Sequence, residues 1–125
     1  MNVDPVELAP GVLLGGSALP VIAGPCVLEE PGQALEIAQI LKGIGSRVGV
    51  PVIFKASYDK ANRSSLASYR GPGLDAGLDV LLQVATETGL PVLTDVHEPN
   101  HCARAAEVCE VLQVPAFLCR QTDLI

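Results

Sequence analysis

Cationic and hydroxyl side chains gather in one stretch of the chain, residues 55–73, directly after the apolar run 50–54. Half of the eight Lys and Arg residues in a chain of net charge −6 lie there: Lys55, Lys60, Arg63 and Arg70. Asn62 and six hydroxyl side chains stand among them: Ser57, Tyr58, Ser64, Ser65, Ser68 and Tyr69. An acidic chain that collects cations and small hydrogen-bond donors in one loop presents a site for an anion. The alternative is a basic loop that is merely solvated.

Polar side chains also follow three other apolar runs. Cys26 comes after the run 19–23, and Asp95 and His97 come after the run 91–94. In the third of these runs, 111–114, the polar segment begins at Gln113, within the run itself. Each run has the length of a strand and is nearly all apolar, which is typical of strands buried on both faces of a parallel sheet.

The segments between the runs have helical periodicity, and Gly49 and Gly89 are expected to end the first two helices. Apolar residues recur at helical spacing in 33–48, in a segment from Leu74, and in about 100–109, where Ala103 and Ala106 are expected to pack. The order β-α-β-α-β-α-β predicts an α/β fold with a parallel sheet, either doubly wound or a β/α barrel. Both architectures place active sites at the carboxyl ends of the strands, where the polar residues stand.

Four strands are half of an eight-stranded barrel, and complete barrels usually need about 250 residues. The 125-residue chain is therefore expected to be the N-terminal half of a longer protein. Residues 1–18 are expected to form an N-terminal arm or hairpin, and residues 19–125 the half-barrel.

Composition excludes several classes of function. The net charge of −6 and the pI near 4.7 argue against nucleic acid as a partner. No apolar run reaches the roughly 18 residues of a membrane span, and the first residues are acidic where a signal peptide is basic. No glycine-rich nucleotide-binding motif follows any strand. The four cysteines form no C-x-x-C pair, and we expect a cytoplasmic protein without disulfides.

Four motifs carry a family resemblance. They are A-G-P-C at 23–26, K-A-S-Y-D-K-A-N-R-S-S at 55–65, T-D-V-H-E at 94–98 and P-A-F-L-C-R-Q-T-D at 115–123. With them the chain resembles 3-deoxy-D-manno-octulosonate 8-phosphate synthase, also called 2-dehydro-3-deoxyphosphooctonate aldolase, from about residue 19 to its end. The resemblance implies a (β/α)8 barrel of which this chain covers about four β/α units. It also implies the condensation of phosphoenolpyruvate with D-arabinose 5-phosphate, a step of lipopolysaccharide biosynthesis.

The resemblance also implies roles for individual residues. Lys55, Ser57 and Lys60 resemble contacts to phosphoenolpyruvate, with Lys60 near the reacting carbons. Further residues match substrate contacts or catalytic positions: Asn62, Arg63 and Ser64 for arabinose 5-phosphate, Gln113 with the backbone of Ala116 and Phe117 for phosphoenolpyruvate, and Asp95 and His97 near the sugar and the metal. Arg120 resembles an arginine that reaches a neighbouring subunit's sugar phosphate, which implies a homo-oligomer, expected to be a homotetramer. The bland alternatives are a helix cap for Asp95 and an ordinary loop histidine for His97.

Cys26 bears on a cofactor. The resembling family has a metal-dependent branch with Cys at this point and a metal-free branch with Asn. A thiolate suits a divalent transition metal such as Zn²⁺, Fe²⁺ or Mn²⁺, whose other ligands would lie outside this chain. Taken alone, Cys26 is better interpreted as a small structural residue, and only the resemblance favours the metal ligand.

Two other functions stay open. The first is a 3-deoxy-arabino-heptulosonate 7-phosphate (DAHP) synthase that uses erythrose 4-phosphate. It is less favoured because that family has a shorter K-P-R-[ST] motif where this chain has K-A-N-R at 60–63. The second is a non-catalytic, truncated half-barrel. Its exposed sheet edges would make the isolated chain poorly soluble and inactive.

Overall fold

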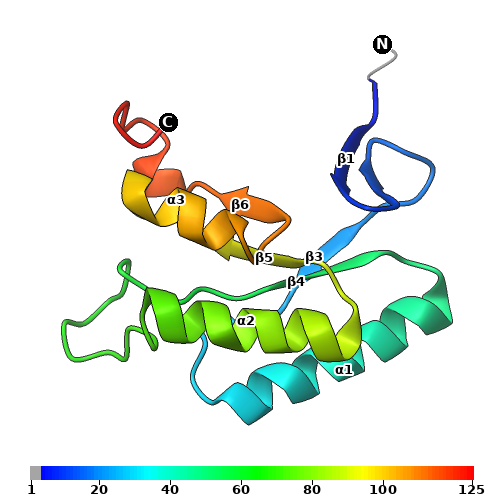
Figure 1. The fold of residues 1–125 in the computed structure, drawn as a ribbon, viewed down its shortest axis with the longest axis horizontal. Coiled ribbons are helices and arrows are strands. Elements are labelled where there is room, and N and C mark those ends of the chain that lie inside the picture. Colours follow the sequence, from blue (N-terminus) through cyan, green and yellow to red (C-terminus); the bar gives the residue numbers. More distant parts are fainter. Residues whose placement is uncertain (1–3) are drawn as a thin grey trace.

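Six strands and three helices make up residues 4–125, the part of the chain that the computed structural model describes (Figure 1). The first three residues of the predicted N-terminal arm lie outside this part. In chain order the elements are β1 Val6–Ala9, β2 Val12–Leu14, β3 Val21–Ala23, α1 Pro31–Val48, β4 Val52–Lys55, α2 Leu74–Thr88, β5 Val92–Asp95, α3 Pro99–Ala106, β6 Val111–Gln113 and a short 3-10 helix Ala116–Leu118.

The four later strands form one parallel sheet in the order β3-β4-β5-β6. Each strand therefore pairs with its neighbour in the sequence, after a crossover through a helix. A doubly wound sheet would reverse direction at a switch point, whereas a barrel adds its strands one after another. The order is that of successive strands in a β/α barrel, and the predicted α/β class is confirmed.

The helices line up along one side of this sheet. Figure 1 shows α1 and α2 side by side beneath the strands, and α2 also contacts α3. Gly49 and Gly89 end α1 and α2 in the left-handed conformation, with φ of 70° at both. Only glycine adopts this conformation without strain, so the two stops predicted from the sequence are confirmed.

The N-terminal hairpin packs against part of the other face of the sheet. β1 and β2 pair antiparallel, and Ala9 and Val12 pack on Ile53 of β4 and Leu93 of β5. Side chains alternate along a strand, so the next residues of the middle strands point to the helices. Phe54 accordingly lies in the main core with α1 and α2.

The prediction that the run 19–23 is a buried core strand is wrong. β3 is an outer strand, and Val21 and Ile22 are 40% and 51% exposed. Its apolar side chains have β4 on one side and no strand on the other within the described residues.

The packing predicted for the third helix is also wrong. Ala103 and Ala106 are exposed, whereas Ala105 and Cys109 are buried and Cys102 packs against the core. α3 has only eight residues, so the small apolar residues on it fit more than one face. None of the helices in residues 4–125 is long and apolar enough to cross a membrane.

Candidate active site

Polar side chains line the hairpin side of the sheet at its carboxyl edge. Lys55 and Asp95 each stand two residues after a side chain that packs on the hairpin, so they project from the same face. Gln113 ends β6 and lies beside Asp95 in the register of the two strands. Three neighbouring strands thus deliver a cation, a carboxylate and an amide to one place.

A cavity of about 500 Å³ lies at this carboxyl edge. Its walls are Cys26, Asp59, Lys60, Ala61, Asn62, Asp95, His97, Gln113, Pro115, Ala116, Phe117 and Leu118. The walls come from the segments that follow all four parallel strands. This is where barrel enzymes bind their substrates.

Asp95 is the centre of a polar network beneath the cavity. Its residue is 9% exposed, and its Oδ1 accepts a hydrogen bond from Ser57 and lies 3.5 Å from Lys55 Nζ. Lys55 Nζ in turn donates to Ser57 Oγ at 2.7 Å. The second carboxylate oxygen lies 2.8 Å from His97 Nε2. A buried carboxylate needs such partners, and here they fix the directions of Lys55 and His97 at the same time.

Because an ionised carboxylate can only accept, the contact with Asp95 places the proton of His97 on Nε2. His97 Nδ1 is then the acceptor nitrogen, and it is buried without a hydrogen-bond partner in the described chain. The imidazole is therefore held in one tautomer and one orientation.

Tyr58 packs behind this network and is not a free donor of the loop. The residue is 1% exposed, and its hydroxyl shares a 3.0 Å hydrogen bond with His101 Nδ1. Its ring meets the His97 ring edge-on, at a centroid distance of 5.4 Å. Burial raises the pKa of Tyr58 to about 12, so it stays a neutral packing residue.

Most of the predicted site residues line the cavity: Cys26, Lys60, Asn62, Asp95, His97, Gln113, Ala116 and Phe117. Lys55 and Ser57 reach it through Asp95. The structure does not bring Arg63, Ser64 or Arg120 to its walls. Arg63 donates to the carbonyl oxygen of Ala61 at 3.1 Å, and Ser64 and Arg120 are exposed.

Sequence reasoning missed Asp59. This carboxylate stands in the cavity wall and forms a two-pronged salt bridge with Arg70, which holds its pKa below the usual range. The two residues are eleven apart in an irregular loop, where no periodicity indicates which side chains meet. His101, the partner of Tyr58, was missed as well.

Cys26 could offer one thiolate ligand to a metal. It is exposed, unpaired and in the cavity wall with Asp59, Asp95 and His97. Residues 4–125 hold no group of three His, Cys, Asp or Glu side chains that could bind a metal ion. The thiol chemistry fits a transition metal, but the remaining ligands would have to come from outside this chain.

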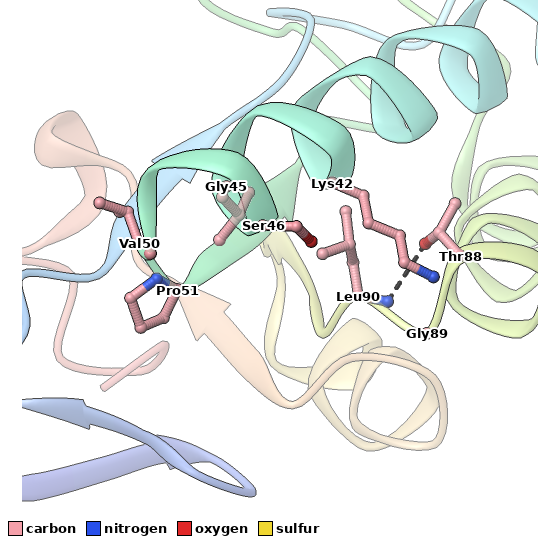
Figure 2. Close-up of a pocket in the computed structure, with 10 residues that line it drawn as sticks. Lys42, Gly45, Ser46, Val50, Pro51, Thr88, Gly89 and Leu90 are labelled. Carbon is pink, nitrogen blue, oxygen red and sulfur yellow. Dashed lines mark hydrogen bonds between the residues drawn. The ribbon is translucent and has the colours of Figure 1, made fainter.

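A second cavity, of about 520 Å³, lies at the opposite edge of the sheet (Figure 2). It sits between the carboxyl ends of α1 and α2 and the segments that lead into β4 and β5. Its walls are glycines, Ser46, Thr88, Lys42 and apolar residues such as Leu90. Figure 2 shows the hydrogen bond from the N–H of Leu90 to Thr88 Oγ1, 3.1 Å long, between two of the residues that line it. Among its walls are no carboxylate, thiol or imidazole.

A model of the DAHP synthetase I family matches residues 4–125. The chain belongs to the DAHP synthetase I family. Among curated proteins it is 57% identical over 122 residues to the 2-dehydro-3-deoxyphosphooctonate aldolase of Rhodopseudomonas palustris (strain BisB5), covering 97% of this chain and 42% of the relative. It is 54% identical to the protein of that name from Koribacter versatilis (strain Ellin345), covering 91% of this chain and 41% of the relative.

These relatives confirm the resemblance stated from the four motifs. The chain spans about 40% of the length of the curated relatives that it matches. Within the DAHP synthetase I family, relatives named as aldolases of the octulosonate type favour this reading over the heptulosonate alternative.

Proposed function

We propose that this chain supplies the first β/α units of an enzyme that condenses phosphoenolpyruvate with D-arabinose 5-phosphate and water. The products are 3-deoxy-D-manno-octulosonate 8-phosphate and inorganic phosphate. The observation that carries the proposal is the cavity at the carboxyl edge, whose walls hold Lys60 and Asn62 from the segment after β4 and Gln113 from the end of β6. The names of the relatives supply the substrates.

The reaction joins two anions and moves charge between them. C3 of phosphoenolpyruvate attacks the aldehyde carbon of the sugar, and the electron pair of the carbonyl takes up a proton. Water adds at C2, and phosphate leaves as the C–O bond breaks. The protein must therefore neutralise two phosphates and a carboxylate while it holds the reacting carbons together.

The described residues can divide this work. Lys60 projects into the cavity, and we assign it to the charge that develops at the reacting carbons. Lys55 and Ser57 would bind phosphoenolpyruvate, held in place by Asp95. Asn62, with Arg63 and Ser64 on the same loop, would bind arabinose 5-phosphate. Gln113 and the backbone N–H groups of Ala116 and Phe117 would complete the phosphoenolpyruvate site.

Asp95 and His97 act as a pair in this proposal. The carboxylate fixes the imidazole through Nε2, while Nδ1 is buried without a hydrogen-bond partner in residues 4–125. The pair would stand near the sugar, with the carboxylate and the imidazole each held in one orientation.

A divalent transition metal belongs to the proposal through Cys26. Bound there, it would supply a Lewis acid that orders substrate or water at the cavity wall. Replacing Cys26 by Asn in an active protein should lower metal affinity, measured by metal content after dialysis against a chelator. Equal metal retention by the variant would remove Cys26 from the ligand set.

We further propose a cytoplasmic homotetramer. The exposed Arg120 and Phe117, which is 76% exposed, are available to a neighbouring subunit. All four cysteines are free, which suits a reducing compartment.

A second candidate is a half-barrel that has no activity by itself. The exposed apolar side chains of β3 favour it, because an outer parallel strand with a bare edge is an aggregation hazard. We therefore expect the isolated 125-residue chain to be poorly soluble and inactive.

The deciding experiment replaces the matched segment of the Rhodopseudomonas palustris relative with this chain. Phosphate release is then measured with phosphoenolpyruvate and either arabinose 5-phosphate or erythrose 4-phosphate, with the unaltered relative as control. Turnover with arabinose 5-phosphate supports the proposal, and preference for erythrose 4-phosphate supports the heptulosonate reaction. A folded chimera without turnover on either sugar supports the non-catalytic reading.

A further inference from the structure

The cationic loop is closed at its neck by one ion pair. Arg70 Nε donates to Asp59 Oδ1 at 2.8 Å, and Arg70 Nη2 donates to Asp59 Oδ2 at 2.5 Å. Beside them the N–H of Lys60 donates to the carbonyl oxygen of Arg70 at 2.5 Å. These bonds hold the two ends of the loop, residues 60–69, against each other.

The body of the loop has no comparable attachment in the described chain. The hydrogen bonds of residues 61–69 stay inside that segment, such as the bond from the N–H of Ser68 to the carbonyl oxygen of Ser65 at 3.1 Å. Leu66 at its tip is 91% exposed, so the loop has little packing. The neck therefore sets how the start of the loop, residues 60–62, lies in the cavity wall.

The same ion pair neutralises a carboxylate in the cavity wall. Asp59 stands in the wall of a cavity that we assign to anions, where an uncompensated carboxylate would repel them. The guanidinium of Arg70 contacts both oxygens of this carboxylate and cancels its charge. Lys60, the next residue, is then left as the cation of this wall segment.

We propose that Arg70 is a positioning residue, which closes the neck of the loop 60–69 and neutralises Asp59 so that Lys60 and Asn62 face the anions correctly. The identity of those anions rests on the proposed function. The neck itself does not, because it follows from the contacts of Asp59 and Arg70.

The first test measures hydrogen exchange of peptides from residues 59–70 in the chimera described above. Arg70→Ala should speed exchange in this segment about fivefold, and Arg70→Lys should give part of that effect because lysine keeps the charge but cannot make both bonds. Arg104→Ala is the matched control. It removes an exposed arginine that also makes a 2.5 Å ion pair, with Glu107, outside the cavity. It should leave exchange at 59–70 unchanged.

The second test uses kinetics in the chimera described above. Arg70→Ala should raise KM for arabinose 5-phosphate about fivefold at low ionic strength, because a bare carboxylate then faces the sugar phosphate, and salt should shrink this defect. The double variant D59N/R70A should recover the KM, since no charge is left, but not the kcat, since the neck stays open. A purely structural role would damage the double variant as much as the single one.

The outcomes separate the two proposals. Exchange at 59–70 in Arg70→Ala equal to that in Arg104→Ala would overturn the role of Arg70, whatever the kinetics show. Faster exchange with unchanged KM and kcat in an active chimera would also overturn it. A folded chimera that turns over neither sugar counts against the proposed function, and the exchange measurement still decides whether Arg70 closes the neck.

Discussion

Two cavities of nearly equal size lie at opposite edges of the same sheet, and they differ in chemistry. The cavity at the carboxyl edge brings together a thiol, two carboxylates, an imidazole, a lysine and two amides. The cavity at the amino edge is slightly larger but is walled by helix ends, glycines and one lysine. Size therefore does not identify the site. The carboxyl edge of a β/α sheet carries function, and the amino edge carries stability.

The largest expected difference between the edges is in thiol reactivity. Cys26 follows β3 at the carboxyl edge and is exposed, whereas Cys109 precedes β6 at the amino edge and is buried. Burial, with a smaller contribution from the charge of Glu110, raises the pKa of Cys109 to about 12. A rise of about three units lowers the thiolate population about a thousandfold at neutral pH.

Iodoacetamide labelling of the native chain, followed by peptide mass spectrometry, should therefore modify Cys26 quickly and Cys109 hardly at all. In denaturant the two cysteines should react at similar rates, which serves as the control. Equal labelling of both in the native chain would show that the amino edge opens freely.

The next largest effect compares two lysines, one in the wall of each cavity. Lys60→Ala should lower kcat/KM of the chimera about a hundredfold to a thousandfold, because it removes the preorganised charge that we propose for the reacting carbons. Lys42→Ala removes the same charge from the other edge and should stay within about twofold of the parent.

Urea unfolding of both variants checks that neither loss reflects unfolding. Similar activity losses in the two lysine variants would abolish the functional distinction between the edges. Such a result would mean that the polar groups of the carboxyl-edge cavity do not identify it as the functional site.

For stability, in contrast to activity, we expect the larger effect at the amino edge, at Gly45 in the wall of its cavity. A Cβ added there would lie 2.7 Å from Cγ2 of Val52 and 2.8 Å from the carbonyl oxygen of Val50. Gly45→Ala should therefore lower the free energy of unfolding by about 1–3 kcal/mol through overpacking. Gly43→Ala, on the same helix with no atom within 4 Å, should be neutral or stabilising by up to about 1 kcal/mol.

Urea unfolding measures both glycine variants, and the kcat of the folded Gly45→Ala chimera should equal that of the parent. A Gly45→Ala protein as stable as the Gly43→Ala protein would contradict the close approach of α1 to β4.

The sequence predicted those parts of the structure that depend on local signals. The apolar runs before Lys55 and Asp95 became β4 and β5, because a strand buried on both faces needs no alternation. Gly49 and Gly89 ended their helices as expected, since only local backbone geometry is involved. Most site residues also reached one cavity, because parallel strands place their carboxyl ends together.

The features that depend on distant neighbours escaped prediction. Val21 and Ile22 have the same composition as the middle strands, yet they are exposed because burial needs a strand on either side. The pairing of Asp59 with Arg70 lies in a loop without periodicity. Tyr58 looked like one more hydroxyl of that loop, and only the fold shows its bond to His101.

The smallest expected effect concerns stability at acidic pH. It would show that the carboxyl edge, which we assign to function, also contributes to stability. Arg70 holds the pKa of Asp59 below its ordinary value of 3.8, chiefly through the hydrogen bonds of the side chains. A carboxyl whose pKa is lower in the folded state adds stability above its unfolded pKa, and that stability is lost as pH falls through the folded pKa. The difference in unfolding free energy between the parent and Arg70→Ala should thus be constant at neutral pH and shrink below about pH 4.

Urea unfolding at a series of pH values measures this difference, and in an Asp59→Asn background it should lose its pH dependence. A difference that stays constant down to pH 2.5, or that survives in the Asp59→Asn background, would show that Arg70 stabilises the fold through some other group. If the expected result holds, the carboxyl edge uses Arg70, one of the four cations of residues 55–73, to hold the loop 60–69. The carboxyl edge then adds a small electrostatic contribution to stability, whereas the amino edge contributes to stability through packing.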